Sequence, residues 1–200
     1  MKRLALLTAL LAFAATAQAA PETYVIDNGQ TVANFSFSYL GMASQANKFD
    51  KTSGKVVFDR DAKTGSAEVT IDATSINTGV ALFNAQIQSE DFFDTARYPV
   101  ITFKSSKMVL NGDQMSLSGD LTIKGVTKPV TLAVTRFKCS PYTAIQGDTC
   151  LANATVTVKR SDFNMGKYAL LAGNDVTLNL AIGAVKAQPP IQLASRDPIR

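Results

Sequence analysis

Apolar and polar residues alternate with a period of two along most of the chain between positions 29 and 185. In one such segment the apolar residues Ala33 and Phe35 would point to one face of a strand, and the polar residue Asn34 between them would point to the other face. This is the spacing of a β-strand with one buried face and one solvated face. The chain is therefore predicted to be all-β. The strands are expected near residues 23–27, 31–40, 45–58 (broken at Gly54), 66–73, 99–109, 114–124, 127–138, 152–160 and 174–186.

Turn signals separate these strands. Asn111-Gly112 is typical of a two-residue β-hairpin. Pro129 interrupts an otherwise good strand, and because proline lacks an N–H it belongs at an edge or a bulge. Strands joined by short turns, apolar on one face and polar on the other, close most naturally into a small antiparallel barrel or sandwich.

One segment, 77–96, departs from the strand pattern. Phe83 and Ile87 are spaced as neighbours on one helical face, and Asn77–Thr78 offers an N-cap. A second short helical turn is predicted after Ser89. This helical segment lies between two strands of one barrel, so we expect it to cap an open end.

The two ends of the chain do not look like part of the fold. Residues 1–19 have a basic start, an apolar run of about a dozen residues and a small-residue cleavage site before Ala20, as a signal peptide requires. We expect export from the cytoplasm, one domain over 20–186 and a flexible tail over 187–200. Cys139 and Cys150, the only cysteines, are predicted to form a disulfide, because an oxidising compartment favours one. A redox pair is the alternative, but the spacing lacks the C-x-x-C pattern.

The composition argues against several kinds of chemistry. Histidine is absent, which removes histidine-dependent triads and ordinary zinc hydrolase sites. We predict no catalytic residues, no metal site and no cofactor, and hence no enzyme. Net charge is +4 and the basic residues are scattered singly, so nucleic-acid binding is not expected. Weak contact with a membrane surface remains open, as does the oligomeric state, a dimer included.

The inward-facing residues are the candidate binding surface, because an eight-stranded barrel is either filled by its own side chains or holds one ligand. Both possibilities stay open at this point. Arg160 ends the inward row that contains Val156, and Arg136 ends the row that contains Val134. A guanidinium at the end of an apolar face can bind a carboxylate or phosphate at the rim. The plainer alternative is an arginine paired with Asp162 or with solvent.

Three motifs resemble a known family. They are SEDFFDTARYPVITF at Ser89–Phe103, GDLTIKGVTKPV at Gly119–Val130 and KRSDF at Lys159–Phe163. With the segment Thr74–Thr78 they are similar, in order and spacing, to the YceI-like, polyisoprenoid-binding periplasmic proteins. The similarity covers roughly residues 23–185, and for an exported chain it implies a periplasmic location.

This resemblance implies an antiparallel, up-and-down, eight-stranded lipocalin-like barrel that holds one isoprenoid tail in an apolar channel. Where the family often carries histidine or charged residues near the opening, this chain has Gln30, Tyr39 and uncharged residues on the helical segment. That departure favours a neutral head group, such as a quinone or a prenyl alcohol. Arg160 and Tyr39 are the candidate head-group contacts. The predicted channel lining is Phe35, Phe37, Tyr39, Val69, Ile71, Phe83, Ile87, Phe92, Phe103, Leu117, Leu121, Val156 and Leu178.

Three other classes compete with a lipid carrier. A non-enzymatic, stress-related binding module would have a filled core and a protein partner. A small outer-membrane barrel would share the signal peptide and the alternation, but its aromatic girdles and polar lumen are not evident in this tryptophan-free chain. An enzyme acting on the lipid ranks last, for want of acid–base residues.

Overall fold

A computed structural model describes residues 20–111, 114–140 and 148–188. The predicted signal peptide, 1–19, lies outside the described residues, as does most of the predicted tail. None of the helices in the described part of the chain has the length and apolar character needed to cross a bilayer.

Strands dominate the described residues, as the alternation predicts. In chain order they are β1 (Glu22–Ile26), β2 (Val32–Tyr39), β3 (Met42–Phe49), β4 (Thr52–Asp59), β5 (Thr64–Asp72), β6 (Ile76–Asn77), β7 (Val100–Asn111), β8 (Gln114–Ile123), β9 (Val126–Ser140), β10 (Thr149–Lys159) and β11 (Ala172–Lys186). One α-helix, α1 (Ala81–Gln88), and three 3₁₀ turns, η1 (Asn28–Gln30), η2 (Ala73–Ser75) and η3 (Arg160–Phe163), complete the elements.

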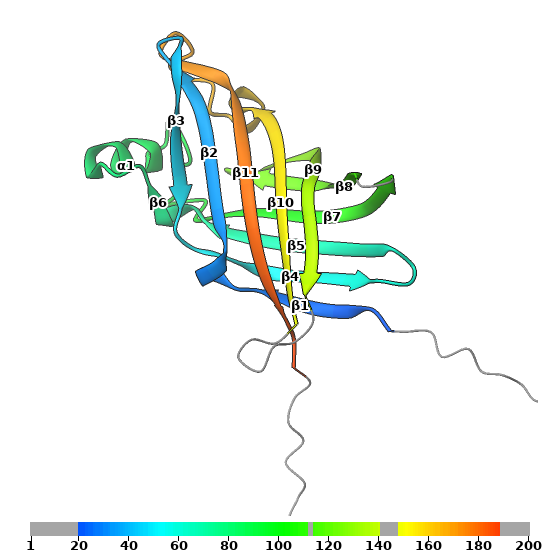
Figure 1. The fold of residues 1–200 in the computed structure, drawn as a ribbon. Coiled ribbons are helices and arrows are strands. Elements are labelled where there is room, and N and C mark those ends of the chain that lie inside the picture. The colour runs from blue at the N-terminus through cyan, green and yellow to red at the C-terminus, as the bar shows by residue number, and fades with distance from the viewer. Residues whose placement is uncertain (1–19, 112–113, 141–147, 189–200) are drawn as a thin grey trace, which may run out of the picture.

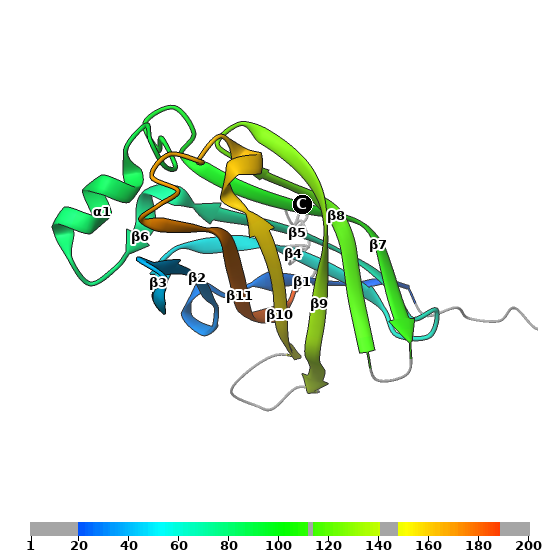
Figure 2. The same cartoon turned by 90° about the horizontal axis from the view of Figure 1, so that it is seen from above.

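Eight of these strands form a closed antiparallel barrel, which confirms the fold class. The ring runs β1-β4-β5-β7-β8-β9-β10-β11 and closes where β11 pairs with β1. Strands β2, β3 and β6 extend the sheet from β11, which pairs with β2 along its first part and with β1 at its end. In Figure 1 the strands β2, β3, β9, β10 and β11 cross steeply in front of β1, β4, β5, β7 and β8, so the barrel is flattened into two layers; Figure 2 shows the same layers from above.

The predicted strand over 45–58 is two strands, and its break lies at Asp50–Lys51 rather than at Gly54. Asn28 shapes this corner, because its amide donates to the Asp50 carbonyl (3.1 Å) and accepts from the Thr52 N–H (2.6 Å). Gly54 serves another purpose. Its φ is +141°, and a Cβ there would lie 2.0 Å from the Glu68 carbonyl oxygen, so only glycine lets β4 and β5 approach at this point.

Two turn predictions are confirmed by strand pairing. Asn111 pairs with Gln114 at the end of the β7–β8 hairpin. Pro129 faces Asp120 of β8, and no residue of β10 pairs with this part of β9, so the proline occupies a local edge.

Arg136 does not face inward, which corrects the prediction from the alternation. Asn153 pairs with Arg136, but the next residue of β10, Ala154, pairs with Val134. The extra residue in β9 is a β-bulge, and it reverses which side chains point inward beyond it. Arg136 is accordingly exposed, while the neighbouring Phe137 packs against the core.

The helix is shorter than predicted. It begins at Ala81 after Gly79, whose φ is +80°, and its N-cap residue Val80 makes no side-chain cap. The second predicted helical turn is wrong: Ser89 ends α1, and the chain then passes through tight turns in which Asp94 has a φ of +50°. Helix α1 lies beside β6 at one flank of the sheet (Figures 1 and 2).

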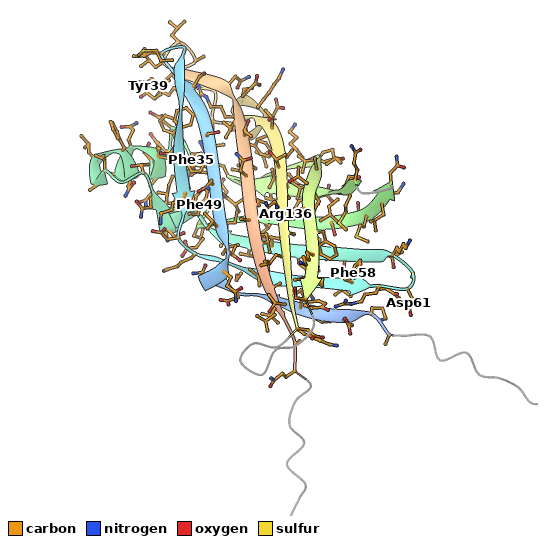
Figure 3. The ribbon with its side chains drawn as sticks, in the orientation of Figure 1. Phe35, Tyr39, Phe49, Phe58, Asp61 and Arg136 are labelled. Atoms are coloured by element: carbon orange, nitrogen blue, oxygen red, sulfur yellow. A yellow bond between two sulfur atoms is a disulfide. The ribbon has the colours of Figure 1, made fainter. Side chains whose placement is uncertain are left out.

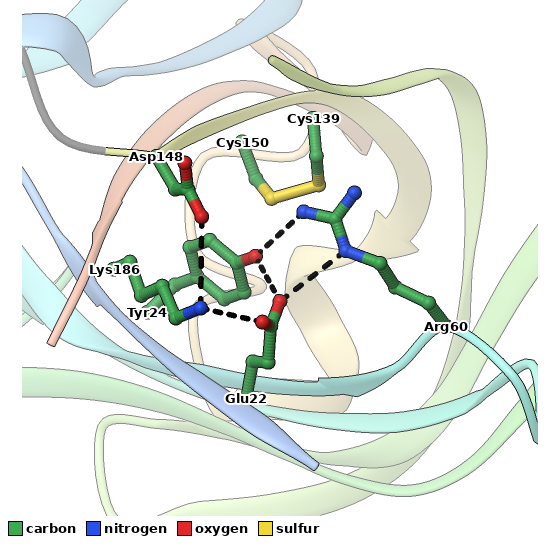
Figure 4. Close-up of a disulfide and its surroundings, with 7 residues drawn as sticks. All are labelled: Glu22, Tyr24, Arg60, Cys139, Asp148, Cys150 and Lys186. Atoms are coloured by element: carbon green, nitrogen blue, oxygen red, sulfur yellow. Dashed lines mark hydrogen bonds and ion pairs between the residues drawn. A yellow bond between two sulfur atoms is a disulfide. The ribbon is translucent and has the colours of Figure 1, made fainter. Parts of the chain in front are cut away.

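A polar cluster and a disulfide lie at the end of the barrel where β1 meets β11 (Figure 4). Cys139 and Cys150 are cross-strand partners and form the predicted disulfide. Beside them the Glu22 carboxylate accepts hydrogen bonds from Lys186 (2.5 Å), from the fully buried Tyr24 (2.7 Å) and from Arg60 (3.2 Å). The Lys186 and Tyr24 hydrogen bonds lower the pKa of Glu22 from 4.5 to about 2. We call this region the closed end.

Candidate functional site

The interior of the barrel contains an apolar cavity of about 80 Å³, which we call the lumen. Strands β2, β5, β7, β8, β10 and β11 contribute inward side chains to it, as the period-two rows predict. Ten of the thirteen residues predicted to line a channel border this cavity: Phe35, Phe37, Val69, Ile71, Ile87, Phe92, Phe103, Leu121, Val156 and Leu178.

Aromatic side chains crowd one side of the lumen. The rings of Phe35 and Phe49 lie with centroids 5.1 Å apart, and Phe93 meets both edge-on at 5.9 and 5.7 Å. Phe35 and Phe49 come from neighbouring strands at mid-height of the barrel (Figure 3). Edge-to-face contacts at these distances are favourable beyond simple burial. All three rings border the lumen, so they fill part of the barrel interior.

Two members of that cluster, Phe49 and Phe93, are absent from the predicted lining. Phe49 follows the inward side of β3, opposite Ala33 of β2, so a correct strand boundary would have identified it. Phe93 borders the lumen because the chain turns sharply at Asp94. The prediction of a second helical turn after Ser89 did not include this sharp turn, so Phe93 was not assigned to the lining.

A second apolar cavity, of about 70 Å³, lies beyond the lumen toward the closed end; we call it the deep chamber. Its wall includes Leu117, Phe58, Phe137 and Cys150, and it shares Val69 and Phe103 with the lumen. Leu117 was expected in the same channel as Leu121. The four-residue separation along β8 corresponds to roughly 13 Å, and that length places the two leucines in different cavities.

A third and larger cavity, of about 410 Å³, opens at the other end, and we call it the mouth. It contains the two remaining predicted residues, Tyr39 and Phe83, which are 46% and 58% exposed. Phe37, Ile87, Phe92 and Ala172 border both the mouth and the lumen. The three cavities therefore follow one another, with shared walls, from the mouth to the closed end.

No charged side chain lines the mouth among the described residues. Its polar groups are neutral ones, namely Tyr39, Asn47, Thr78, Gln86 and Tyr168. Tyr39 and Gln86 can exchange hydrogen bonds with a carbonyl or hydroxyl group, whereas the Tyr168 hydroxyl already donates to Asp91. The arrangement suits an uncharged polar group better than a phosphate, which would need cations or a cluster of N–H donors.

A latch joins the two loops on either side of the mouth. Asp91 accepts a hydrogen bond from the Tyr168 hydroxyl (2.8 Å) and pairs with Lys167 (2.7 Å). These two partners lower the pKa of Asp91. The ring of Phe92 stacks on that of Tyr168 at 5.9 Å. The segment after α1 is thereby held against the segment between η3 and β11.

Arg160 has a structural setting that differs from the plainer sequence-based interpretation, an arginine paired with Asp162 or with solvent. Its side chain is 4% exposed, and its guanidinium donates to backbone carbonyl oxygens rather than pairing with Asp162 or solvent. The acceptors are Gly173 (3.0 Å), Lys167 (2.6 Å), Ala172 (2.7 Å) and Met165. Burial lowers the pKa of Arg160. Although Arg160 borders the lumen, four carbonyls already engage its N–H groups, and its contact with a head group stays an untested prediction.

Comparisons with known proteins agree with this geometry. The model of the YceI-like domain family matches residues 24–184. Protein YceI of Escherichia coli O157:H7 is 37% identical over 131 residues, which cover 64% of this chain and 69% of that protein.

Two solved structures illustrate the similarity of the fold. BcnA of Burkholderia cenocepacia superposes with a TM-score of 0.71 at 29% identity, covering 80% of this chain and 99% of that one. A polyisoprenoid binding domain from Saccharophagus degradans superposes with a TM-score of 0.61 at 20% identity, covering 82% and 98% of the two chains, and this likeness concerns the fold alone.

Proposed function

Because the chain belongs to the YceI-like family, we propose that it is a periplasmic carrier for an isoprenoid lipid. The tail would lie along the barrel axis and the head group would lie in the mouth. The protein would act by burying the lipid and would not make or break bonds. The absence of histidine from the chain is consistent with binding rather than acid–base catalysis.

The observation that supports this proposal most strongly is the succession of three cavities with shared walls. A hydrocarbon tail entering at Phe37 would pass Leu121 in the lumen and end near Leu117 in the deep chamber. Each prenyl unit buries on the order of 100 Å², which is favourable by about 2.5 kcal/mol. Several units therefore give tight binding even after the cost of association.

The lumen must widen for such a tail to enter. On the same scale one water needs about 10–15 Å³, so about 80 Å³ holds a short hydrocarbon fragment but not several prenyl units. Phe93 is the side chain best placed to move, because it comes from a loop rather than from a strand of the barrel. We propose that the empty barrel closes on its aromatic cluster and that the lipid displaces Phe93.

The neutral lining of the mouth supports a neutral head group. Tyr39 and Gln86 would donate hydrogen bonds to a quinone carbonyl or to a prenyl alcohol oxygen. A prenyl pyrophosphate would bring a multiple negative charge to a site whose described lining has no cation, and desolvation would oppose its entry.

Native mass spectrometry of protein gently purified from a bacterial periplasm tests the proposal. We expect a co-purifying isoprenoid mass, or saturable one-to-one uptake of added geranylgeraniol in preference to geranylgeranyl pyrophosphate. Val156→Phe fills the lumen and should reduce uptake, whereas Thr157→Phe places the same ring on the outer face and should not. A wild-type protein with neither co-purified nor added lipid would overturn the proposal.

The narrow lumen also favours a second candidate, a binding module with a filled core and a protein partner. In that case a lipophilic ligand would show no saturable uptake, and Val156→Phe would change stability alone. The mass-spectrometric titration separates the two candidates.

A further inference from the structure

The end of the barrel that carries the mouth exposes large apolar side chains. Leu170 is 95% exposed, Leu82 is 77% exposed and Met42 is 65% exposed. They belong to three segments that each contribute a residue to the lining of the mouth: the end of β2 and its turn into β3, helix α1, and the loop between η3 and β11. We call the following set the apolar rim: Leu40, Met42, Leu82, Phe83, Leu170 and Leu171.

Hydrogen bonds hold two of these segments together. The Leu40 N–H donates to the Leu171 carbonyl oxygen (2.7 Å), and Tyr39 pairs with Ala172 in the sheet. The latch at Asp91 secures the same loop from its other side. These bonds fix the backbone of the β2–β3 turn against that of the loop before β11, so both segments present their leucines at the same end of the barrel. Several large exposed apolar side chains around one opening are typical of a binding surface.

Two of the segments that form the mouth contain no charged residues. The segments 32–47 and 73–89, which supply β2, β3 and α1, contain no Asp, Glu, Lys or Arg, although such residues make up 18% of the chain. Lys167, beside the rim, is paired with Asp91. The closed end, in contrast, carries Glu22, Arg60 and Lys186. The apolar rim itself thus contains no charged residue, and the nearest ion pair is the latch of Lys167 and Asp91.

We propose that the apolar rim docks on the surface of a lipid bilayer, with its leucines inserted at the boundary between head groups and hydrocarbon. This proposal rests on the proposed function, because an isoprenoid lipid resides in a bilayer and the rim surrounds the opening through which it would pass. The mouth would then face the membrane, and the lipid would move between two apolar media without crossing water. Because the rim is uncharged, docking depends on apolar insertion rather than on anionic lipid.

Flotation with phosphatidylcholine vesicles that contain no isoprenoid tests the docking by itself. The wild-type protein should float with the vesicles, and raising salt from about 50 mM to about 500 mM should change this little, since no charge is screened. The double variant Leu40→Asn, Leu170→Asn should bind at least about tenfold more weakly, given the area of two leucines. The matched double variant Val25→Asn, Leu151→Asn alters half-exposed residues near the closed end and should bind within about twofold of wild type.

The outcomes separate docking from lipid carriage. No flotation of the wild type, flotation that needs anionic lipid and disappears in salt, or equal loss in both variants would each overturn the docking. The double rim variant could also float like wild type and yet sediment with a different coefficient. That result would overturn the docking and would assign the rim to contact with a protein partner or a second copy of this chain. A wild type that floats but never takes up geranylgeraniol would support docking and overturn the proposed function.

Discussion

Replacing Glu22 with glutamine should destabilise the barrel at neutral pH and leave it unchanged in strong acid. The Glu22 carboxylate is the shared acceptor of the closed end, where Lys186, Tyr24 and Arg60 all donate to it. Those bonds favour the ionised form, so the pKa of Glu22 falls from 4.5 to about 2. The folded state therefore holds its proton less tightly than the unfolded state does.

The size of the effect follows from this difference. At 1.36 kcal/mol per pKa unit, the lowering corresponds to about 3 kcal/mol. The Glu22 side chain is 27% exposed, and solvent screening reduces the expected contribution to about 1–2 kcal/mol. Because the folded pKa is the lower one, the stabilisation is complete above pH 4.5 and disappears as the pH falls toward 2.

Urea denaturation of the oxidised protein between pH 7 and pH 2 measures this. The free energies of unfolding of wild type and Glu22→Gln should differ by about 1–2 kcal/mol at pH 7 and converge near pH 2. Glu68→Gln is the matched control, because Glu68 also has two lysine neighbours, Lys55 and Lys104, but lies on the surface; its effect should be smaller. Equal stability at pH 7, or a difference that persists unchanged at pH 2, would refute the reasoning.

Three further variants probe the aromatic cluster, the buried Arg160 and the disulfide. Phe93→Ala should lower the free energy of unfolding by about 2–4 kcal/mol in urea titrations, yet increase geranylgeraniol uptake in native mass spectrometry; unchanged uptake would argue against Phe93 as the side chain that yields. Arg160→Met should cost about 3 kcal/mol in the same titrations, since it removes the donors of four backbone carbonyls. Cys139→Ser with Cys150→Ser should cost up to about 3 kcal/mol while lipid uptake persists, and a loss of uptake in the folded variant would contradict a purely structural disulfide.

Much of the barrel could be predicted from the alternation of apolar and polar residues. Successive side chains of a strand point to opposite faces, so a strand with one buried face must carry its apolar residues at every second position. The rows through Phe35 on β2 and Val156 on β10 face the lumen as expected. That argument fails wherever an extra residue enters a strand. The bulge beside Asn153 turns Arg136 outward, and nothing in the local sequence announces it.

The parts of the site that escaped prediction depend on irregular backbone. Phe93 joins the aromatic cluster because Asp94 adopts a left-handed conformation, which aspartate tolerates better than most residues do. Arg160 is held by carbonyls that lie five to thirteen residues further along the chain, and such contacts leave no spacing pattern. The mouth is formed by three segments that are far apart in the sequence. Sequence reasoning could therefore name individual residues of the mouth but could not show that they lie together.

The central claim is that a hydrocarbon tail can occupy the inside of this barrel. Difference electron density from crystals of the protein loaded with geranylgeraniol tests it most directly. We predict continuous density from Phe37 at the mouth to Leu121 in the lumen, with the Phe93 ring displaced from Phe35 and Phe49. An unchanged aromatic cluster, with the lipid absent or bound only on the outer surface, would contradict the account.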